Sequence, residues 1–215
     1  MCDVKLFQGR IIAIFSIALS PCFSWAGGLQ SLQQFMTTVK SAQAEFTQVV
    51  TAPPKDGQAA RAKTSSGSFE FARPNRFKFV YRQPFAQTMV GDGQNLWLFD
   101  ADLNQVTVRK QADVLAGTPA LLTAAPDLAA LQVHFNLQDA PDREGLQWVQ
   151  ATPKAGDGAL QSVRLGFAGA DLKVLEMVDN FGQRSVLTFK AMQINPVLPP
   201  QTFVFTPPKG ADVLR

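Results

Sequence analysis

Large apolar and polar side chains alternate most clearly between residues 67 and 109. Phe69 and Phe71 lie two residues apart in one segment, and Phe77 and Phe79 lie two apart in the next. Because side chains two residues apart share one face of a β-strand, each segment predicts a strand with an aromatic face and a more polar face.

Turn signals separate these two strands from each other and from the strands that follow. Arg73-Pro74-Asn75 and Gln83-Pro84 interrupt the alternation. Asp92-Gly93 is a strong hairpin signal, because tight hairpin turns need positive φ angles. Further strands are predicted over residues 86–91, 96–100 and 105–109. The stretch therefore predicts an antiparallel meander that is large and apolar on one side.

The chain before this meander predicts one helix and one strand. Apolar residues recur at helical spacing from Leu29 to Val39, which indicates an amphipathic helix. A strand follows over residues 44–51, and a loop is expected over residues 53–58 before the next strand restarts near Ala62. One face of the 44–51 strand carries Phe46, Gln48 and Val50.

The spacing of apolar residues changes after the meander, where two short helices are predicted. Thr118 can cap the first helix, over residues 120–125, and Pro119 suits its first position. Asp127 can cap the second, over residues 128–131. Both helices carry few charges, so they form either a lid over an apolar surface or a plug that closes one end of a core.

Alternation returns in the second half of the chain. Val133 and Phe135 predict a strand with His134 on its polar face, and Phe203 and Phe205 predict the last strand. With the segments between them, the chain offers about eleven strands. This pattern indicates a mainly β (α+β) fold built on a large antiparallel sheet, strongly curved or barrel-like.

The first 26 residues predict a secretory signal peptide rather than part of the fold. Basic residues precede a short apolar run at Ile11–Leu19, and Ser24-Trp25-Ala26 offers small residues at a cleavage site. We expect cleavage after Ala26 and one domain over residues 27–215. No later stretch is long and apolar enough to predict a membrane-spanning helix.

Both cysteines lie within this leader, so the mature chain is expected to have no thiol and no disulfide. An alternative is that Cys22 is acylated, which would make the protein membrane-anchored. Pro21 fits this alternative poorly, since a small residue is expected just before an acylated cysteine.

Net charge and aromatic content narrow the range of ligands. The net charge is +3 without a Lys/Arg cluster, which disfavours nucleic-acid binding. The chain has 17 Phe but 1 Tyr, which fits either a Phe-rich core or a core that also surrounds a cavity.

Candidate catalytic chemistry is sparse. His134 is the single histidine, and no nucleophile-elbow, zinc-protease or phosphate-loop motif is present. A solvent-facing His134 is favoured over a general base of a lipid hydrolase. We expect no enzyme activity, no metal and no cofactor.

Three motifs carry a resemblance to a known family. They are Arg73-Pro74-Asn75 with the aromatic strand up to Phe79, a DGxxLWxFD pattern at Asp92–Asp100, and an FxFxPPxG pattern at Phe203–Gly210. Residues 117–122 match as well. The chain resembles the LolA family of periplasmic outer-membrane lipoprotein carrier proteins over essentially all of its mature length. The resemblance implies an incomplete antiparallel β-barrel, closed by a helical lid, that carries lipoprotein acyl chains in its cavity.

The resemblance also implies roles for single residues. Arg73 is expected to gate the lid by donating hydrogen bonds to its backbone carbonyls, for which a planar guanidinium suits better than a lysine. Lys78 should point away from the cavity, because it would otherwise be buried unpaired. The residues expected to contact acyl chains are Phe69, Phe71, Phe77, Phe79, Leu96 and Leu98. The residues expected in the lid are Pro119, Leu121, Leu122 and Leu128.

The implied partners are acylated lipoproteins and two membrane assemblies. An inner-membrane lipoprotein-releasing ABC transporter would load the carrier, and the outer-membrane receptor LolB would unload it. The carrier is expected to be a periplasmic monomer that uses no ATP. The alternative with an acylated Cys22 would instead resemble LolB itself, which is membrane-anchored.

Overall fold

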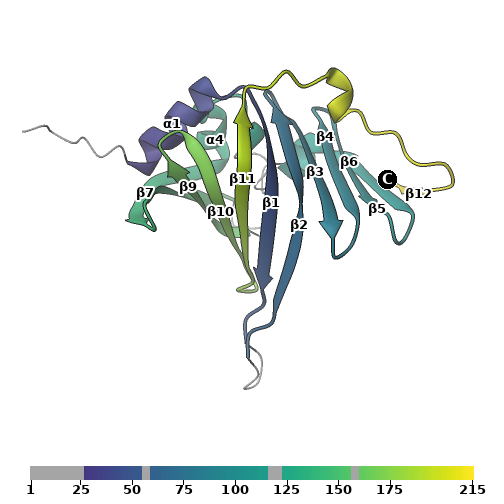
Figure 1. Ribbon diagram of the computed structural model, residues 1–215, viewed down its shortest axis with the longest axis horizontal. Coiled ribbons are helices and arrows are strands. Elements are labelled where there is room, and N and C mark those ends of the chain that lie inside the picture. Colours follow the sequence, from purple (N-terminus) through teal and green to yellow (C-terminus); the bar gives the residue numbers. More distant parts are fainter. Residues whose placement is uncertain (1–26, 55–58, 116–122, 156–159) are drawn as a thin grey trace, which may run out of the picture.

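The computed structural model describes residues 27–54, 59–115, 123–155 and 160–215, and its main feature is one twelve-stranded sheet (Figure 1). The strand order is β12-β6-β5-β4-β3-β2-β1-β11-β10-β9-β8-β7. All neighbouring strands are antiparallel except β12 and β6, which are parallel. The sheet curves strongly but stays open, because β7 and β12 lie at opposite edges. The predicted mainly β fold with an incomplete barrel is thus confirmed.

The strands are β1 Ser41–Thr51, β2 Ala62–Ala72, β3 Arg76–Gln83, β4 Gln87–Asp92, β5 Asn95–Asp100, β6 Gln105–Lys110, β7 Phe135–Arg143, β8 Leu146–Pro153, β9 Leu160–Ala168, β10 Asp171–Asp179, β11 Arg184–Ile194 and β12 Asp212–Leu214. The helices are α1 Gly28–Thr38, α2 Gln111–Leu115, α4 Leu128–His134 and the 3-10 helix η1 Pro200–Phe203. Residues 123 and 124 are also helical. The expected signal peptide, residues 1–26, and the lid residues Pro119, Leu121 and Leu122 lie outside the described residues.

The register between strands collects the aromatic side chains of β1, β2, β3 and β11 on one face, which we call the inner face. Phe69 of β2 pairs with Phe79 of β3, and Phe79 pairs with Met89 of β4. Phe46 of β1 pairs with Phe189 of β11, and the Phe46 ring lies 5.7 Å from that of Phe79. The alternation in the sequence therefore continues across five strands as one apolar wall.

Helix α1 packs its apolar stripe on the inner face at the β7–β10 side of the sheet. Leu32, Phe35 and Met36 are buried, and the Phe35 ring lies 5.7 Å from that of Phe167. The helix starts very close to the sheet at Gly28, where a β-carbon would stand 2.0 Å from the carbonyl oxygen of Trp148. The predicted amphipathic helix is confirmed.

Helix α4 corrects the prediction for residues 132–134. Asp127 does cap it, since its carboxylate accepts a hydrogen bond of 2.8 Å from the Ala130 backbone N–H. The helix continues to His134, however, so His134 does not lie on a strand. The alternation of Val133 with Phe135 resembled a strand, but Val133 is 66% exposed on the helix and β7 begins only at Phe135.

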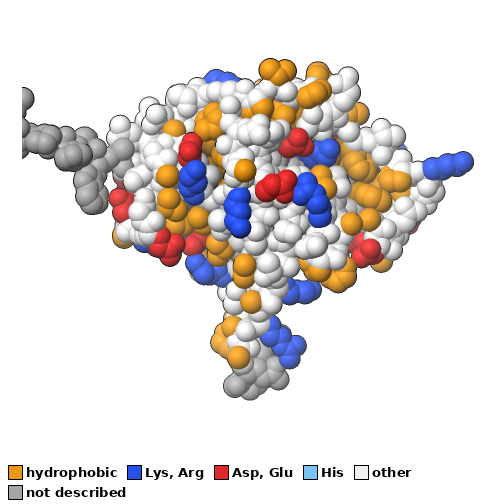
Figure 2. Space-filling view, viewed as in Figure 1, with side chains coloured by type: hydrophobic (Ala, Val, Ile, Leu, Met, Phe, Trp, Pro, Cys, Tyr) orange, Lys and Arg blue, Asp and Glu red, His pale blue; other side chains and the backbone are white. Residues whose placement is uncertain are grey.

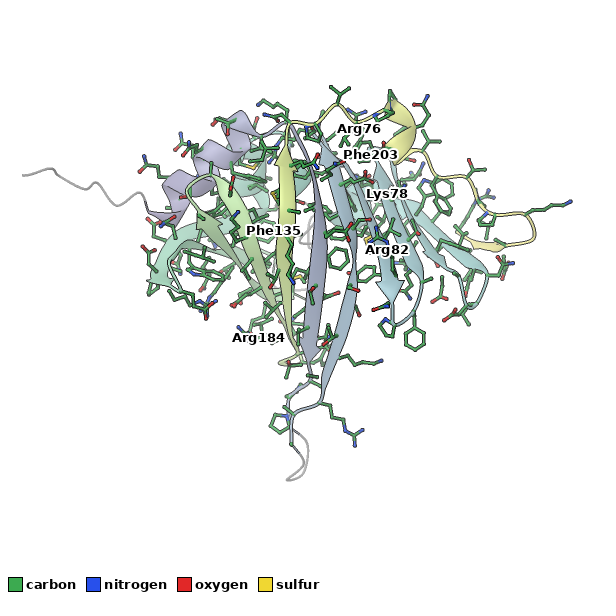
Figure 3. The ribbon with its side chains drawn as sticks, in the orientation of Figure 1. Arg76, Lys78, Arg82, Phe135, Arg184 and Phe203 are labelled. Atoms are coloured by element: carbon green, nitrogen blue, oxygen red, sulfur yellow. The ribbon has the colours of Figure 1, made fainter. Side chains whose placement is uncertain are left out.

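The C-terminal segment also differs from the prediction, because Phe203 and Phe205 are not on a strand. The segment crosses the outer face of β3–β6, where the Phe205 ring lies 5.6 Å from that of Trp97. Figure 3 shows Phe203 beside Arg76, whose guanidinium lies 5.6 Å from the Phe203 ring centre. Prolines before and after this segment exclude ladder hydrogen bonds at those positions, so the last strand forms only at β12.

The outer face over β11, β1 and β2 carries charged side chains, which Figure 2 shows near its centre. Glu45 forms an exposed salt bridge of 2.7 Å with Arg82, and Lys78 pairs across strands with Glu70. Lys78 thus lies on the face opposite Phe77 and Phe79. Among the described residues, no helix has the length and apolar character needed to cross a membrane.

Candidate functional site

An apolar cavity of about 240 Å³ opens on the inner face of the sheet. Its wall combines the β3–β5 meander with β10 and β11, two regions far apart in the sequence. Thr123, from the segment before α4, covers part of it. The lining residues are Gln48, Phe77, Phe79, Tyr81, Met89, Leu96, Thr123, Leu175, Met177, Leu187 and Phe189.

The position of Phe77 in this wall depends on a glycine in the neighbouring strand. Phe77 pairs with Gly91, and a β-carbon at Gly91 would stand 2.3 Å from the Phe77 ring. Any larger residue at position 91 would therefore displace the ring. Gly91, which has no side chain, thus leaves room for the Phe77 ring in the cavity wall.

The six residues predicted to contact acyl chains divide into three groups. Phe77, Phe79 and Leu96 line the cavity. Leu98 lines a neighbouring hollow of about 380 Å³ together with Phe85. Phe69 and Phe71 are fully buried, and the Phe69 ring stacks 4.4 Å from that of Phe79, so these two residues support the wall.

Arg73 joins the end of α1 to the segment that precedes α4. Its Nε donates a hydrogen bond of 2.8 Å to the Val39 carbonyl, and its Nη1 donates to the Ala125 carbonyl. The guanidinium also lies 5.2 Å from the Phe35 ring centre and 5.1 Å from that of Phe71. Burial lowers the pKa of Arg73 from its ordinary value to about 10, so the side chain remains charged at neutral pH.

A second contact fixes the same segment. The Asn75 backbone N–H donates a hydrogen bond of 2.7 Å to the Ala124 carbonyl. Gln111, which is buried, donates from Nε2 to the Asn75 carbonyl at 2.6 Å and accepts from the Gly93 N–H at 3.0 Å. The turn between β2 and β3 therefore holds residues 124 and 125 through two carbonyls, an arrangement that we call the clamp.

Sequence reasoning found Arg73 through the family resemblance but missed Asn75 and Gln111. Their contacts use backbone groups, which leave no pattern in the side-chain sequence. The missed cavity residues on β10 and β11 had a signal, because Leu187 and Phe189 alternate with polar neighbours in the same way as Phe77 and Phe79. Of the predicted lid residues within the described part, Leu128 is half-buried against the core.

His134 lies away from this cavity. It is exposed at the C-terminal end of α4, and its backbone carbonyl accepts a hydrogen bond of 2.9 Å from the Lys154 N–H. In the part of the chain that the structure describes, no group of three or more His, Cys, Asp or Glu residues is arranged to hold a metal ion. The cavity itself offers apolar surface and few polar groups.

Comparison with known proteins gives consistent results. The family "Outer membrane lipoprotein carrier protein LolA" matches residues 37–206. An outer-membrane lipoprotein carrier protein of Albidiferax ferrireducens is 60% identical, with 96% of this chain and 99% of the relative covered. One from Methylibium petroleiphilum is 48% identical, with 96% and 98% covered.

A solved structure supports the fold alone. An uncharacterized conserved protein from Thermus thermophilus superposes with a TM-score of 0.50 at 13% identity, covering 87% of this chain and 96% of that one. The family match and the two relatives extend over most of the chain that forms the sheet, the cavity and the clamp. This chain therefore belongs to the LolA family of outer-membrane lipoprotein carrier proteins.

Proposed function

We propose that this protein is a periplasmic chaperone that carries acylated lipoproteins between two membranes. An inner-membrane ABC transporter loads it, its cavity shields the acyl chains from water, and an outer-membrane receptor, LolB, unloads it. The apolar cavity between β3–β5 and β10–β11, beside a clamped segment, is the observation that carries this proposal. The protein acts as a monomer without catalysis or cofactor.

The need for such a carrier follows from the hydrophobic effect. An acyl chain of about sixteen carbons exposes some fifteen methylenes, and each costs about 0.8 kcal/mol in water, or roughly 12 kcal/mol per chain. A lipoprotein with several such chains cannot cross an aqueous compartment without cover. Transfer onward needs a higher affinity at each successive acceptor, which requires no ATP at the carrier.

The size of the cavity supports a movable cover. Its volume of about 240 Å³ is below the roughly 300 to 1,000 Å³ of pockets that hold a single drug-sized ligand. Several acyl chains therefore need a wider space than the closed form offers. Met89 and Met177 line the cavity with flexible side chains that can adapt to chains of different shape.

Arg73 is the gating residue in this proposal. The segment at 124 and 125 lies next to Thr123, which covers the cavity, and Arg73 holds it through the Ala125 carbonyl. Breaking this bond would let the segment move away from the inner face. Phe77, Phe79 and Leu96 would then contact the chains directly.

A release assay tests the function. The chain from Gly27 to Arg215 is added to spheroplasts that make a radiolabelled lipoprotein destined for the outer membrane, and the soluble fraction is analysed. We expect acylated lipoprotein in that fraction, bound to this protein. Release into solution without binding, or no release by the folded protein with a matched transporter, would contradict the proposal.

A further inference from the structure

We propose that Gln48, together with Ser185, recognises the ester and amide carbonyls through which acyl chains are attached to the cargo. This inference rests on the proposed carrier function and adds the orientation in which an acyl chain would bind. The hydrocarbon would extend toward Phe77 and Phe79, and the polar anchor would stay at Gln48. A carrier that only buried hydrocarbon would have no such preference.

Gln48 is the largest of a few polar side chains, with Ser65 and Ser185, that interrupt the apolar inner face at this level. It lies on β1, where it pairs with Leu187 of β11 on one side and with Ser65 of β2 on the other. Its Nε2 donates a hydrogen bond of 2.6 Å to the hydroxyl of Ser185, which is 9% exposed. Phe46, two residues before Gln48, is 2% exposed among the aromatic rings.

Three hollows of the inner face meet at Gln48. The side chain lines the apolar cavity of about 240 Å³, the hollow of about 380 Å³ beside Phe85 and Leu98, and a third hollow of about 300 Å³. The third is bordered by Ser185 and by Asp179 at the end of β10. Gln48 is the residue that lines all three spaces, so a ligand that extends from one space into another can reach its amide.

The character of the inner face changes at this position. On the side toward Phe77, the cavity wall is aromatic and aliphatic. On the other side, the hollow beside Phe85 keeps an apolar lining but adds Lys63, Ser65 and Gln87, and the third hollow adds Asp179, Gln183 and Ser185. An amphiphilic ligand with a hydrocarbon tail and a polar head fits this gradient in one direction.

The hydrogen-bonding capacity of the pair matches a carbonyl. A glutamine amide has two N–H donors and one acceptor oxygen, and a serine hydroxyl has one donor. The bond between Gln48 and Ser185 uses one amide N–H, so a second amide N–H and the hydroxyl hydrogen can serve a ligand. Ester and amide carbonyls are hydrogen-bond acceptors, and burying such a carbonyl without a donor is costly.

The test compares the effect of one substitution on two ligands that both carry long hydrocarbon chains, only one of which has carbonyls. One is a tripalmitoylated cysteinyl peptide, with ester and amide carbonyls, and the other is hexadecylpyrene, which has none. Their dissociation constants are measured on the wild-type chain and on Gln48→Leu, which keeps the side-chain volume similar. Gln43→Leu is the matched control, because Gln43 lies on the outer face of the same strand and bonds Gln193 at 2.8 Å.

We expect Gln48→Leu to bind the lipopeptide about three- to tenfold more weakly, the loss expected for one hydrogen bond. Binding of hexadecylpyrene should stay the same or tighten, and Gln43→Leu should match the wild type with both ligands. Adding Ser185→Ala to Gln48→Leu should give little further loss, because the two side chains act as one unit.

Two results would overturn the inference while leaving the carrier function intact. One is an equal loss for both ligands, which would give Gln48 a purely structural role between β1 and β11. The other is unchanged lipopeptide binding by Gln48→Leu. A wild-type chain that binds hexadecylpyrene but not the lipopeptide would instead refute the carrier function itself, and this inference with it.

Discussion

Arg73→Leu tests whether the clamp is a gate. The substitution removes the hydrogen bonds from the guanidinium to the Val39 and Ala125 carbonyls, and it leaves the Asn75 contact to Ala124 in place. We expect the segment at 124 and 125 to open more often, while the sheet and its core remain folded. Onward transfer of cargo to an acceptor should be impaired.

The expected change in the free energy of unfolding is the difference between the burial cost of the charged guanidinium and the gain from its hydrogen bonds. The fall in the pKa of Arg73 from its ordinary value to about 10 corresponds to roughly 3 kcal/mol of burial cost for the charged form. Hydrogen bonds from a charged donor contribute about 1.5 to 3 kcal/mol each, so the two bonds offset that cost. Leucine removes both the burial cost and the hydrogen bonds. The free energy of global unfolding should therefore change by less than about 2 kcal/mol.

The local equilibrium should respond more strongly than global stability. In the closed form of the variant, the Ala125 carbonyl loses its donor, which costs about 1 to 3 kcal/mol when the group stays buried. In the open form, water can hydrate that carbonyl. The closed form should therefore become about 5- to 150-fold less favoured relative to the open form.

Hydrogen exchange at the Asn75 amide measures this shift directly, because that N–H is bonded to the Ala124 carbonyl at 2.7 Å. Exchange should accelerate in Arg73→Leu by the factor above. Arg82→Leu is the control, since it removes an exposed salt bridge to Glu45 on the outer face, typically worth at most about 1 kcal/mol. Wild-type protection of Asn75 in Arg73→Leu would refute the gating argument.

Three further substitutions test other parts of the structure. Gly91→Val should destabilise the fold by about 1 to 3 kcal/mol in urea unfolding, because the valine side chain would collide with the Phe77 ring. An unchanged urea midpoint would contradict this close packing. Burial raises the pKa of Asp92, but hydrogen bonds from the Asn95 and Gln94 N–H groups and the Trp97 indole outweigh this and lower it below 3.8. Asp92 therefore stabilises the fold above that value, and Asp92→Asn should flatten the loss of stability as pH falls below about 4. His134→Ala should leave lipoprotein transfer unchanged, and loss of transfer by the folded variant would revive a catalytic role for His134.

The sequence predicted best those parts of the fold in which side-chain alternation is fixed by burial. The meander from β2 to β6 and helix α1 follow this rule, because a shift of one residue would expose the aromatic face. The prediction was wrong where two periodicities overlap. Val133 and Phe135 are two residues apart, yet Val133 lies in the last turn of a helix that ends at His134, and Phe135 begins a strand.

The site was harder to predict than the sheet, for a physical reason. Phe77 and Phe79 can be assigned to a wall from local pattern, but the opposite wall of β10 and β11 lies about a hundred residues later in the chain. The clamp depends on backbone carbonyls whose donors are set by tertiary position. The C-terminal aromatics Phe203 and Phe205 cover the outer face, although local alternation alone would equally suit a strand.

The free-energy cost of opening the clamp is much smaller than the gain from covering an acyl chain. This difference explains how one fold could both shield the acyl chains from water and release them. Opening the Arg73 contact costs a few kcal/mol, whereas covering one acyl chain gains roughly 12 kcal/mol relative to water. In the proposed mechanism, cargo opens the segment at little relative cost, and the closed form returns once the chains have left. Reclosure around Phe77 and Phe79 buries apolar wall that would otherwise face water, so it favours departure of the cargo toward an acceptor. A clamp that gates the cavity as proposed would lower the affinity of the carrier by a modest amount, which is what transfer to a tighter-binding acceptor requires.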